Sequence, residues 1–215
     1  MQIARDENNF DRQKRIKKLR RKIKRLAWFP SYQSFSEIGL RGKRDDSERY
    51  RYLDFSKCRG KIVVDFGCNV GQTCVKAQKA GAKRVIGLDC QKDTITLAKE
   101  IAELLDFQIE YYVIDFNDPD FKEKVNAIID NKKIDISFFL SIYRTKELND
   151  REGLFNYIID ITDEVIFFEG HADPGLDTED YYVEVFKRFP VEYRFFGYTQ
   201  NNSRPFFEVY PRKNI

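Results

Sequence analysis

The chain has 215 residues, of which 42% are hydrophobic, and this suffices for one folded domain with a sizeable core and an appendage. No apolar run approaches the ~18 residues of a membrane-spanning helix, and the N-terminus lacks the apolar core of a signal peptide. Four cysteines without zinc-ligand spacing and a single histidine argue against a metal site. We therefore expect free thiols and a cytoplasmic protein.

The formal net charge is +3, but it is unevenly distributed. Residues 1–26 contain eleven Lys and Arg and three acids, and the remainder contains 27 bases and 32 acids. Apolar residues of this basic arm recur at helical spacing and so share one face: Ile16, Leu19, Ile23 and Leu26. The pattern predicts a basic helix from about Phe10 to Pro30, with acids at its N-terminal end.

Three uses of this helix remain open. Residues 10–26 have the charge to contact the phosphate backbone of RNA or DNA, or to lie on an anionic membrane surface. Alternatively, the helix packs its apolar stripe on the domain and leaves its charges in solvent.

Residues 31–60 show no clear period at first, which predicts a loop or lid, followed by a short helix from Asp46 or Ser47 to about Leu53. From residue 61 onward strand and helix patterns alternate, as in a parallel sheet built of βαβ units. Strands are expected at 61–66, 84–89, 109–114, 134–141, 164–169, 191–199 and 205–210, and helices at 72–80, 92–106, from 119, at 150–161 and at 178–189. Three segments result: 1–30, 31–60 and 61–215.

A glycine loop follows the first of these strands. Asp65 stands at the end of an apolar run, and Gly67 and Gly71 follow it, four residues apart. Asn69 replaces the second glycine of a dinucleotide fingerprint, and no Gly-Lys-Ser/Thr sequence indicates a phosphate loop. Strand, glycine turn and helix together predict a ligand site at the carboxyl end of the sheet, although a tight turn without a ligand has the same pattern.

The Asp-x-Gly-x-x-x-Gly pattern of this loop resembles the first motif of the class I S-adenosylmethionine (SAM)-dependent methyltransferases. The resemblance extends over about residues 35–212. It implies an α/β, Rossmann-like sheet of seven strands in the order 3-2-1-4-5-7-6 with strand 7 antiparallel, and SAM as the cofactor. A carboxylate beside the turn suits the ammonium and sulfonium of SAM, whereas it would repel a phosphate.

Two further acids match positions that contact adenosine in this family. Asp89, followed by Cys90, ends the second strand, where a carboxylate can accept both ribose hydroxyls. Asp115 matches the acid that accepts from the adenine amine, and the backbone N–H of Phe116 matches the donor to the ring. The alternatives are a helix N-cap for Asp89 and an Asx turn for Asp115.

The resemblance also implies contacts to the amino-acid end of SAM. Leu140 and Ser141 match the carbonyls that face its amino group. A Gly-x-Arg before the first strand resembles a subgroup related to enzymes that modify wobble uridines of tRNA and to sugar and small-molecule O-methyltransferases. Arg44, or alternatively Arg41, matches an arginine near the SAM carboxylate or the substrate, unless it is a surface residue paired with a neighbouring acid.

Candidate acceptor residues follow the fourth and fifth strands. Tyr143 and Arg144 stand where the related subgroup often has histidines, and either can orient an acceptor or, for Tyr143, simply pack. Glu169 and His171, the single histidine, end the fifth strand. A neutral imidazole can take a proton from an acceptor hydroxyl or amine, with Glu169 orienting it or binding substrate, although a single histidine is often structural.

The sequence thus predicts a SAM-dependent methyltransferase that moves a methyl group to an oxygen or nitrogen nucleophile by in-line displacement, with RNA as a candidate acceptor. Its alternatives are a small-molecule or glycan O-methyltransferase and a non-catalytic protein that binds SAM or RNA.

Overall fold

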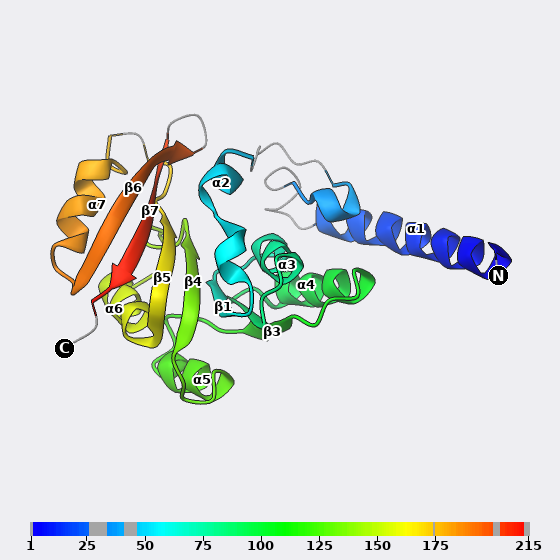
Figure 1. Ribbon diagram of the computed structural model, residues 1–215, viewed down its shortest axis with the longest axis horizontal. Coiled ribbons are helices and arrows are strands. Elements are labelled where there is room, and N and C mark those ends of the chain that lie inside the picture. The colour runs from blue at the N-terminus through cyan, green and yellow to red at the C-terminus, as the bar shows by residue number, and fades with distance from the viewer. Residues whose placement is uncertain (1, 26–33, 41–46, 174, 200–202, 213–215) are drawn as a thin grey trace.

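The computed structural model describes residues 2–25, 34–40, 47–173, 175–199 and 203–212, and the side chains of residues 2–10 and 24 lie outside this description. A twisted seven-stranded sheet runs through the molecule, with helices on both faces and a long helix projecting from one end (Figure 1). In the part described, no helix combines the length and apolar character needed to cross a membrane.

The strand order is β3-β2-β1-β4-β5-β7-β6, and β7 is antiparallel to both of its neighbours. This confirms the predicted class I methyltransferase topology, and every predicted strand is present with its ends within two residues of the expectation. The strands are β1 (Ile62–Phe66), β2 (Arg84–Asp89), β3 (Glu110–Val113), β4 (Ile134–Leu140), β5 (Thr162–Glu169), β6 (Val191–Thr199) and β7 (Arg204–Pro211).

Successive strand residues point to opposite faces, and so the sheet has an apolar core on each side. Val63 packs in one core with α3 and α4, and Val64 packs in the other with α5, α6 and α7. The helices are α1 (Gln2–Arg25), α2 (Ser47–Tyr52), α3 (Gln72–Lys79), α4 (Lys92–Leu104), α5 (Phe121–Ile128), α6 (Arg151–Ile161) and α7 (Glu179–Phe186), with 3₁₀ turns η1 (Ser36–Ile38) and η2 (Phe55–Cys58).

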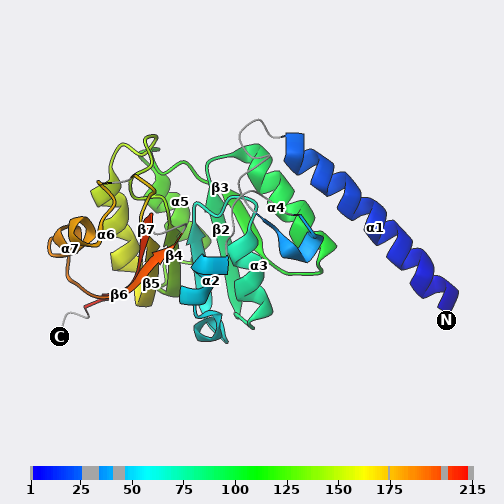
Figure 2. The ribbon, with the colours of Figure 1, turned by 90° about the horizontal axis from the view of Figure 1, so that it is seen from above.

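The basic helix differs from its prediction in extent. α1 begins at Gln2 rather than near Phe10, and its first turn contains no acid, so the acids expected at its N-terminal end lie further along it. Ile16, Leu19 and Ile23 are buried in a third apolar cluster with residues of α4, while Leu26 and Pro30 lie outside the described residues. α1 therefore lies along α4 and extends past the domain (Figure 2).

The parallel strands β1, β2 and β4 end at the same edge of the sheet, because they run in one direction in matched register. Phe66, Asp89 and Leu140 are their last residues. The loops that leave these ends are held in turns: Gly67, Asn69 and Ser141 have positive φ angles of 79°, 52° and 62°. The fold thus concentrates irregular backbone where open α/β sheets bind ligands.

Candidate functional site

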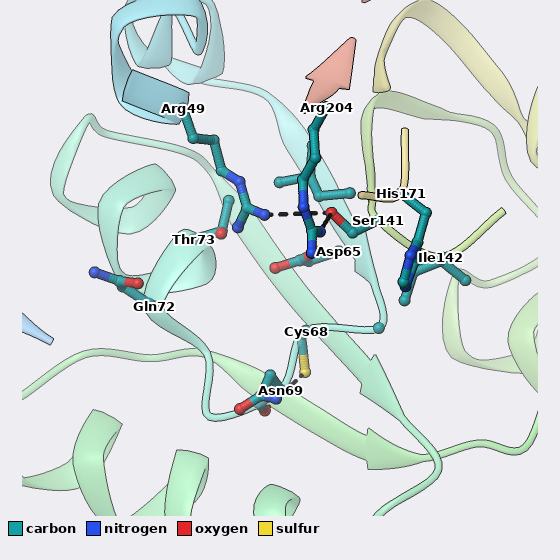
Figure 3. A pocket seen from close by; sticks show the side chains of 12 residues that line it. Arg49, Asp65, Cys68, Asn69, Gln72, Thr73, Ser141, Ile142, His171 and Arg204 are labelled. Carbon is teal, nitrogen blue, oxygen red and sulfur yellow. Dashed lines mark hydrogen bonds between the residues drawn. The ribbon is translucent and has the colours of Figure 1, made fainter. Parts of the chain in front are cut away.

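Two adjoining cavities open at this edge of the sheet, with volumes of about 210 Å³ and about 450 Å³. Gly67, Asn69 and Ile142 line both. The two cavities differ in charge: the smaller is lined by two arginines and a histidine, and the larger by three acidic residues. The smaller is lined by Arg49, Asp65, Gly67, Cys68, Asn69, Gln72, Thr73, Leu140, Ser141, Ile142, His171 and Arg204 (Figure 3).

In the glycine loop between the cavities, Gly67 and Gly71 occupy positions where a side chain would clash and the backbone would be strained. A Cβ on Gly67 would stand 2.3 Å from Cδ1 of Ile142, and its φ of +79° is unfavourable for other residues. Gly71 precedes α3 at φ +80°, where a Cβ would meet the Tyr111 hydroxyl at 2.1 Å. Asn69 tolerates the left-handed region well, which explains how it replaces a glycine.

The larger cavity contains most of the predicted adenosine residues. Asp89, Cys90, Asp115 and Phe116 line it, together with Glu147. Oδ2 of Asp89 accepts the N–H of Asn69 at 2.9 Å, and its Oδ1 accepts the N–H of Gln91 at 2.9 Å. The Asp89 carboxylate therefore joins the glycine loop to the start of α4 and still has lone pairs for a ligand.

Asp115 makes the alternative contact foreseen for it. Its Oδ1 accepts the N–H of Asn117 at 2.9 Å, which is an Asx turn, and its exposed side chain still lines the larger cavity. Phe116 packs against Phe66 with ring centroids 5.9 Å apart. One wall of the larger cavity is thus aromatic, as suits the ring of a nucleobase.

Two arginines distant in sequence converge at the smaller cavity. Arg49 comes from α2 and Arg204 from the start of β7, and both donate to the Ser141 hydroxyl (Figure 3). Both are buried, with 5% and 3% of their surfaces exposed. They carry positive charge into a cavity that also contains the acid of the glycine loop.

Glu169 holds this cluster together. It is fully buried, and Arg49 donates to both of its carboxylate oxygens, through Nε at 3.0 Å and through a second, shorter bond. Thr199 and Ser141 donate to the same carboxylate, and Arg204 lies 3.8 Å from it. The structure therefore gives Glu169 the contacts of a buried ion-pair anchor, and its role toward His171 or a substrate stays a prediction.

Asp65 is the other acid of the smaller cavity. Burial raises the pKa of its carboxyl group to about 7, and the Cys74 thiol, 3.5 Å away, and the charge of Arg49 oppose that rise. Its side chain is only 3% exposed. Near neutral pH Asp65 is thus poised between its protonated and ionised forms, so a cation placed beside it would favour ionisation.

His171 lines the same cavity on a loop that follows β5. Its backbone N–H donates to Asp177 at 3.2 Å, and Asp177 also accepts from the Tyr182 hydroxyl. Burial, and next the charge of Arg204, lower the imidazole pKa below its usual value. The ring is therefore neutral at pH 7 and able to accept a proton.

Tyr143 lies elsewhere. It is 1% exposed and packs in the aromatic core, with ring centroids 5.8 Å from both Phe155 and Phe168. It lines neither cavity, so the structure supports the packing alternative and corrects its candidacy as a catalytic residue. Arg144 is turned toward Asp177 at 3.3 Å, and Arg41 and Arg44 lie outside the described residues.

Sequence reasoning missed several lining residues. Arg49 falls in the predicted short helix, and the sequence pattern of that helix does not distinguish it from the neighbouring Arg51. Arg204 was assigned to a connection between strands, although it begins β7. Gln72 and Thr73 begin α3 directly after the glycine loop, and Ile142 follows β4 by two residues, so these positions would have identified them.

The chain was compared with known proteins. A family model described as "Methyltransferase domain" matches residues 57–166, which are 110 of the 215 residues. The ribosomal protein L11 methyltransferase of Tolumonas auensis is 37% identical over 65 residues, 29% of this chain and 22% of the relative. The bifunctional kinase-methyltransferase WbdD superposes with a TM-score of 0.64 at 22% identity, covering 92% of this chain and 47% of that chain.

A third similar protein is the T. thermophilus 16S rRNA methyltransferase RsmC, solved with AdoMet and guanosine. Its TM-score is 0.56 at 15% identity, over 77% of this chain and 41% of that chain. The matches thus span at most about half the length of these proteins. The strand order and the family match agree with the resemblance of the glycine loop to class I methyltransferases, and the chain belongs to the methyltransferase domain family.

Proposed function

We propose that this protein is a SAM-dependent methyltransferase whose cofactor occupies both cavities. The observation that carries the proposal is that an acidic cavity with an aromatic wall and a cavity with cations and an acid meet at one glycine loop. SAM has the same division, with an adenosine at one end and a zwitterionic amino acid at the other. Membership of the methyltransferase domain family supports the assignment.

The larger cavity fits adenosine. Asp89 would accept the ribose hydroxyls, with Cys90 beside it, while Asp115 and the backbone of Phe116 would face the adenine edge. The two backbone N–H groups already bound by Asp89 hold its carboxylate in a fixed orientation, and such preorganisation reduces the entropy lost on binding.

The smaller cavity fits the amino-acid end. Asp65 and the carbonyls of Leu140 and Ser141 would face the ammonium, and Arg49 or Arg204 would face the carboxylate. Either arginine would share the role expected for Arg44, which lies outside the described residues. The raised pKa of Asp65 predicts that ligand binding tightens as pH rises toward 8, because the ammonium requires the ionised carboxylate.

When bound, SAM supplies a methyl group that its sulfonium has already activated. The contribution of this chain is to position an oxygen or nitrogen nucleophile. Well-oriented intramolecular reactions have effective molarities of roughly 10⁵–10⁸ M, which shows how much positioning alone can contribute. His171, neutral at pH 7 on the wall of the smaller cavity, would accept the nucleophile's proton.

RNA is the acceptor class that we favour, because the chain carries an exposed basic helix. The similarity to RsmC, whose structure contains guanosine, is compatible with this choice. A small-molecule or glycan acceptor is the alternative, and a non-catalytic protein that binds SAM or RNA is the second. These alternatives predict different destinations for a labelled methyl group.

The cofactor site is tested with a matched pair of glycine variants. Gly67→Ala places a Cβ against Ile142, whereas Gly60→Ala introduces a similar backbone strain at φ +71° with no atom within 4 Å. We expect calorimetry to show SAM binding weakened at least about tenfold in Gly67→Ala and in Asp89→Ala, and unchanged in Gly60→Ala. Unchanged affinity in both site variants would refute the assignment.

The reaction is tested by incubating the protein with methyl-labelled SAM and a cell extract separated into RNA, protein, glycan or lipid, and small-molecule fractions. Label in RNA supports the favoured acceptor. Label in a glycan or small-molecule fraction replaces it with the first alternative. SAM binding without label in any fraction supports the non-catalytic alternative.

A further inference from the structure

The solvent face of α1 carries a line of cations. Lys14, Lys18, Arg21 and Arg25, here called the basic row, are spaced by four, three and four residues and are all exposed. At 3.6 residues per turn this spacing keeps them on one side of the helix, and at 1.5 Å per residue the row is about 16 Å long. Lys17 lies beside the row and is exposed as well.

The opposite face of α1 fixes the helix to the domain. Ile16, Leu19 and Ile23 are buried in the cluster that contains Leu97 and Ile101 of α4. Cations on the flanks of this stripe bind the domain too: Arg15 pairs with Glu103 at 2.9 Å, Lys22 pairs with Glu100 at 2.6 Å, and Arg20 donates to the carbonyl of Ile38.

The described cations of α1 therefore include two groups, one paired with the domain and one facing solvent. Those on the flanks are matched by acids or carbonyls of the domain, whereas no ion pair joins the basic row to any acidic side chain in the described part of the chain. The row keeps its positive field, and the docking on α4 holds it in place (Figure 2). Because the helix is already docked, binding to a phosphate backbone would order only the side chains of the row and not its backbone.

We propose that the basic row binds the phosphate backbone of RNA. This rests on the proposed function and adds to it the face of the molecule that would hold the RNA, although the surface itself is independent of the cofactor site. A membrane is a poorer match, because interfacial helices insert an apolar face and all the apolar side chains between residues 11 and 25 are buried against the domain. The exposed face of α1 can therefore attract a partner only through its positive charge, which is the main interaction in binding to a phosphate backbone.

The test compares two variants that lose the same charge. The row variant replaces the four cations of the basic row with Gln. The control variant makes the same change at four exposed cations elsewhere: Arg59, Lys83, Lys122 and Lys132. Circular dichroism and thermal unfolding establish that both remain folded, and calorimetry measures SAM affinity in each.

Binding of a fluorescein-labelled single-stranded RNA of about 30 nucleotides is measured against KCl concentration. We expect the row variant to bind at least about tenfold more weakly near 0.1 M KCl and to lose about 3 from the slope of log K against log salt, since each phosphate contact contributes about 0.7. The control variant should retain most of the affinity and slope, and a row variant rebuilt with Lys at all four positions should recover them.

An equal loss in both variants would overturn the proposal, because it would show a response to net charge only. Wild-type binding to vesicles with about 30% phosphatidylserine, without binding to RNA, would overturn it in favour of a membrane surface. If the wild-type protein does not bind SAM, only the cofactor assignment is refuted, because RNA binding by the basic row is measured without SAM.

Discussion

At the scale of single residues, burial decides what the charged groups of the site can do. Glu169 is an acid at a strand end, as a catalytic carboxylate would be, yet its oxygens are occupied by Arg49, Thr199 and Ser141. Asp65 lies nearby, and among the described residues the Cys74 thiol is its one hydrogen-bond donor; burial raises its pKa to about 7. The first acid is therefore fixed as a charged anchor, and the second remains free to respond to a ligand.

The raised pKa of Asp65 predicts a pH-dependent stability. The folded state keeps a proton that the unfolded state releases between about pH 4 and about pH 7, so the free energy of unfolding contributed by Asp65 falls as pH rises through this window. Asp65→Asn removes this loss. We expect the variant to gain up to about 4 kcal/mol relative to wild type between pH 4 and pH 8, at 1.36 kcal/mol per pKa unit.

Urea unfolding at several pH values measures this difference. Asp106→Asn is the control, because Asp106 is exposed and its positive φ of 58° suits Asn equally well. Its difference from wild type should stay constant with pH. A constant difference for Asp65→Asn as well would show that the carboxyl group is ionised throughout.

At the scale of elements, α1 is a helix whose stability comes from docking. Its sequence is almost entirely polar apart from the stripe, and like charges along its outer face repel one another. Ile16, Leu19 and Ile23 offset this repulsion by packing on α4 and η1. Helices in proteins commonly depend on such tertiary burial rather than on intrinsic propensity.

Leu19→Ala tests this dependence. Leu19 is 4% exposed, and truncating such a buried leucine costs about 2–5 kcal/mol in general. We expect hydrogen exchange in α1 to accelerate strongly while exchange in β1 and β4 changes little, because the helix can undock without unfolding the sheet. Lys18→Ala, one position away and exposed, should leave exchange unaltered. Uniform acceleration throughout the domain would instead show that α1 unfolds only with the sheet.

At the scale of the whole molecule, α1 both covers the domain and extends it. The helix packs on Leu97, Ile101 and Leu104 of α4 with one face, and its other face carries the exposed basic row. Both ribbon views show α1 extending from the end of the molecule (Figures 1 and 2). The cofactor cavities lie at the carboxyl edge of the sheet. α4, on which α1 packs, begins at this edge: Gln91 is its N-cap residue and donates its backbone N–H to Asp89. The same helix thus links the predicted cofactor site to the basic surface.

Removing residues 1–25 should therefore do more than remove charge. The truncated protein exposes the apolar face of α4, so we expect a melting temperature lower by several degrees and increased binding of an apolar dye, since each kcal/mol shifts the melting temperature by about 2–4 °C at this size. The row variant should show neither effect. Equal melting temperatures for the truncated and intact proteins would indicate that α1 adds nothing to the stability of the domain.

The succession of strands and helices and the position of the glycine loop follow from local sequence, whereas the order of the strands in the sheet was implied by the resemblance to class I methyltransferases. Strand and helix periods alternate over short ranges, and Gly67 and Gly71 stand where the backbone needs positive φ, so both were predictable from neighbouring residues. The arginines of the smaller cavity were not. Arg49 and Arg204 meet only because α2 and β7 pack against the same edge, and no local pattern records a contact between residues so distant in the chain.

By itself the sequence determined the succession of strands and helices, the position of the glycine loop and the acids Asp65, Asp89 and Asp115 at strand ends, because strand ends and turns are encoded in short-range patterns. The class I methyltransferase topology was implied by the resemblance of that loop to the family's first motif. Only the tertiary structure decided which side chains reach the cavities. It placed Tyr143 in the aromatic core and Glu169 in an ion-pair cluster, and it turned the apolar stripe of α1 onto α4. Burial and pairing depend on what other segments bring to the same place, and that information is distributed over the whole chain.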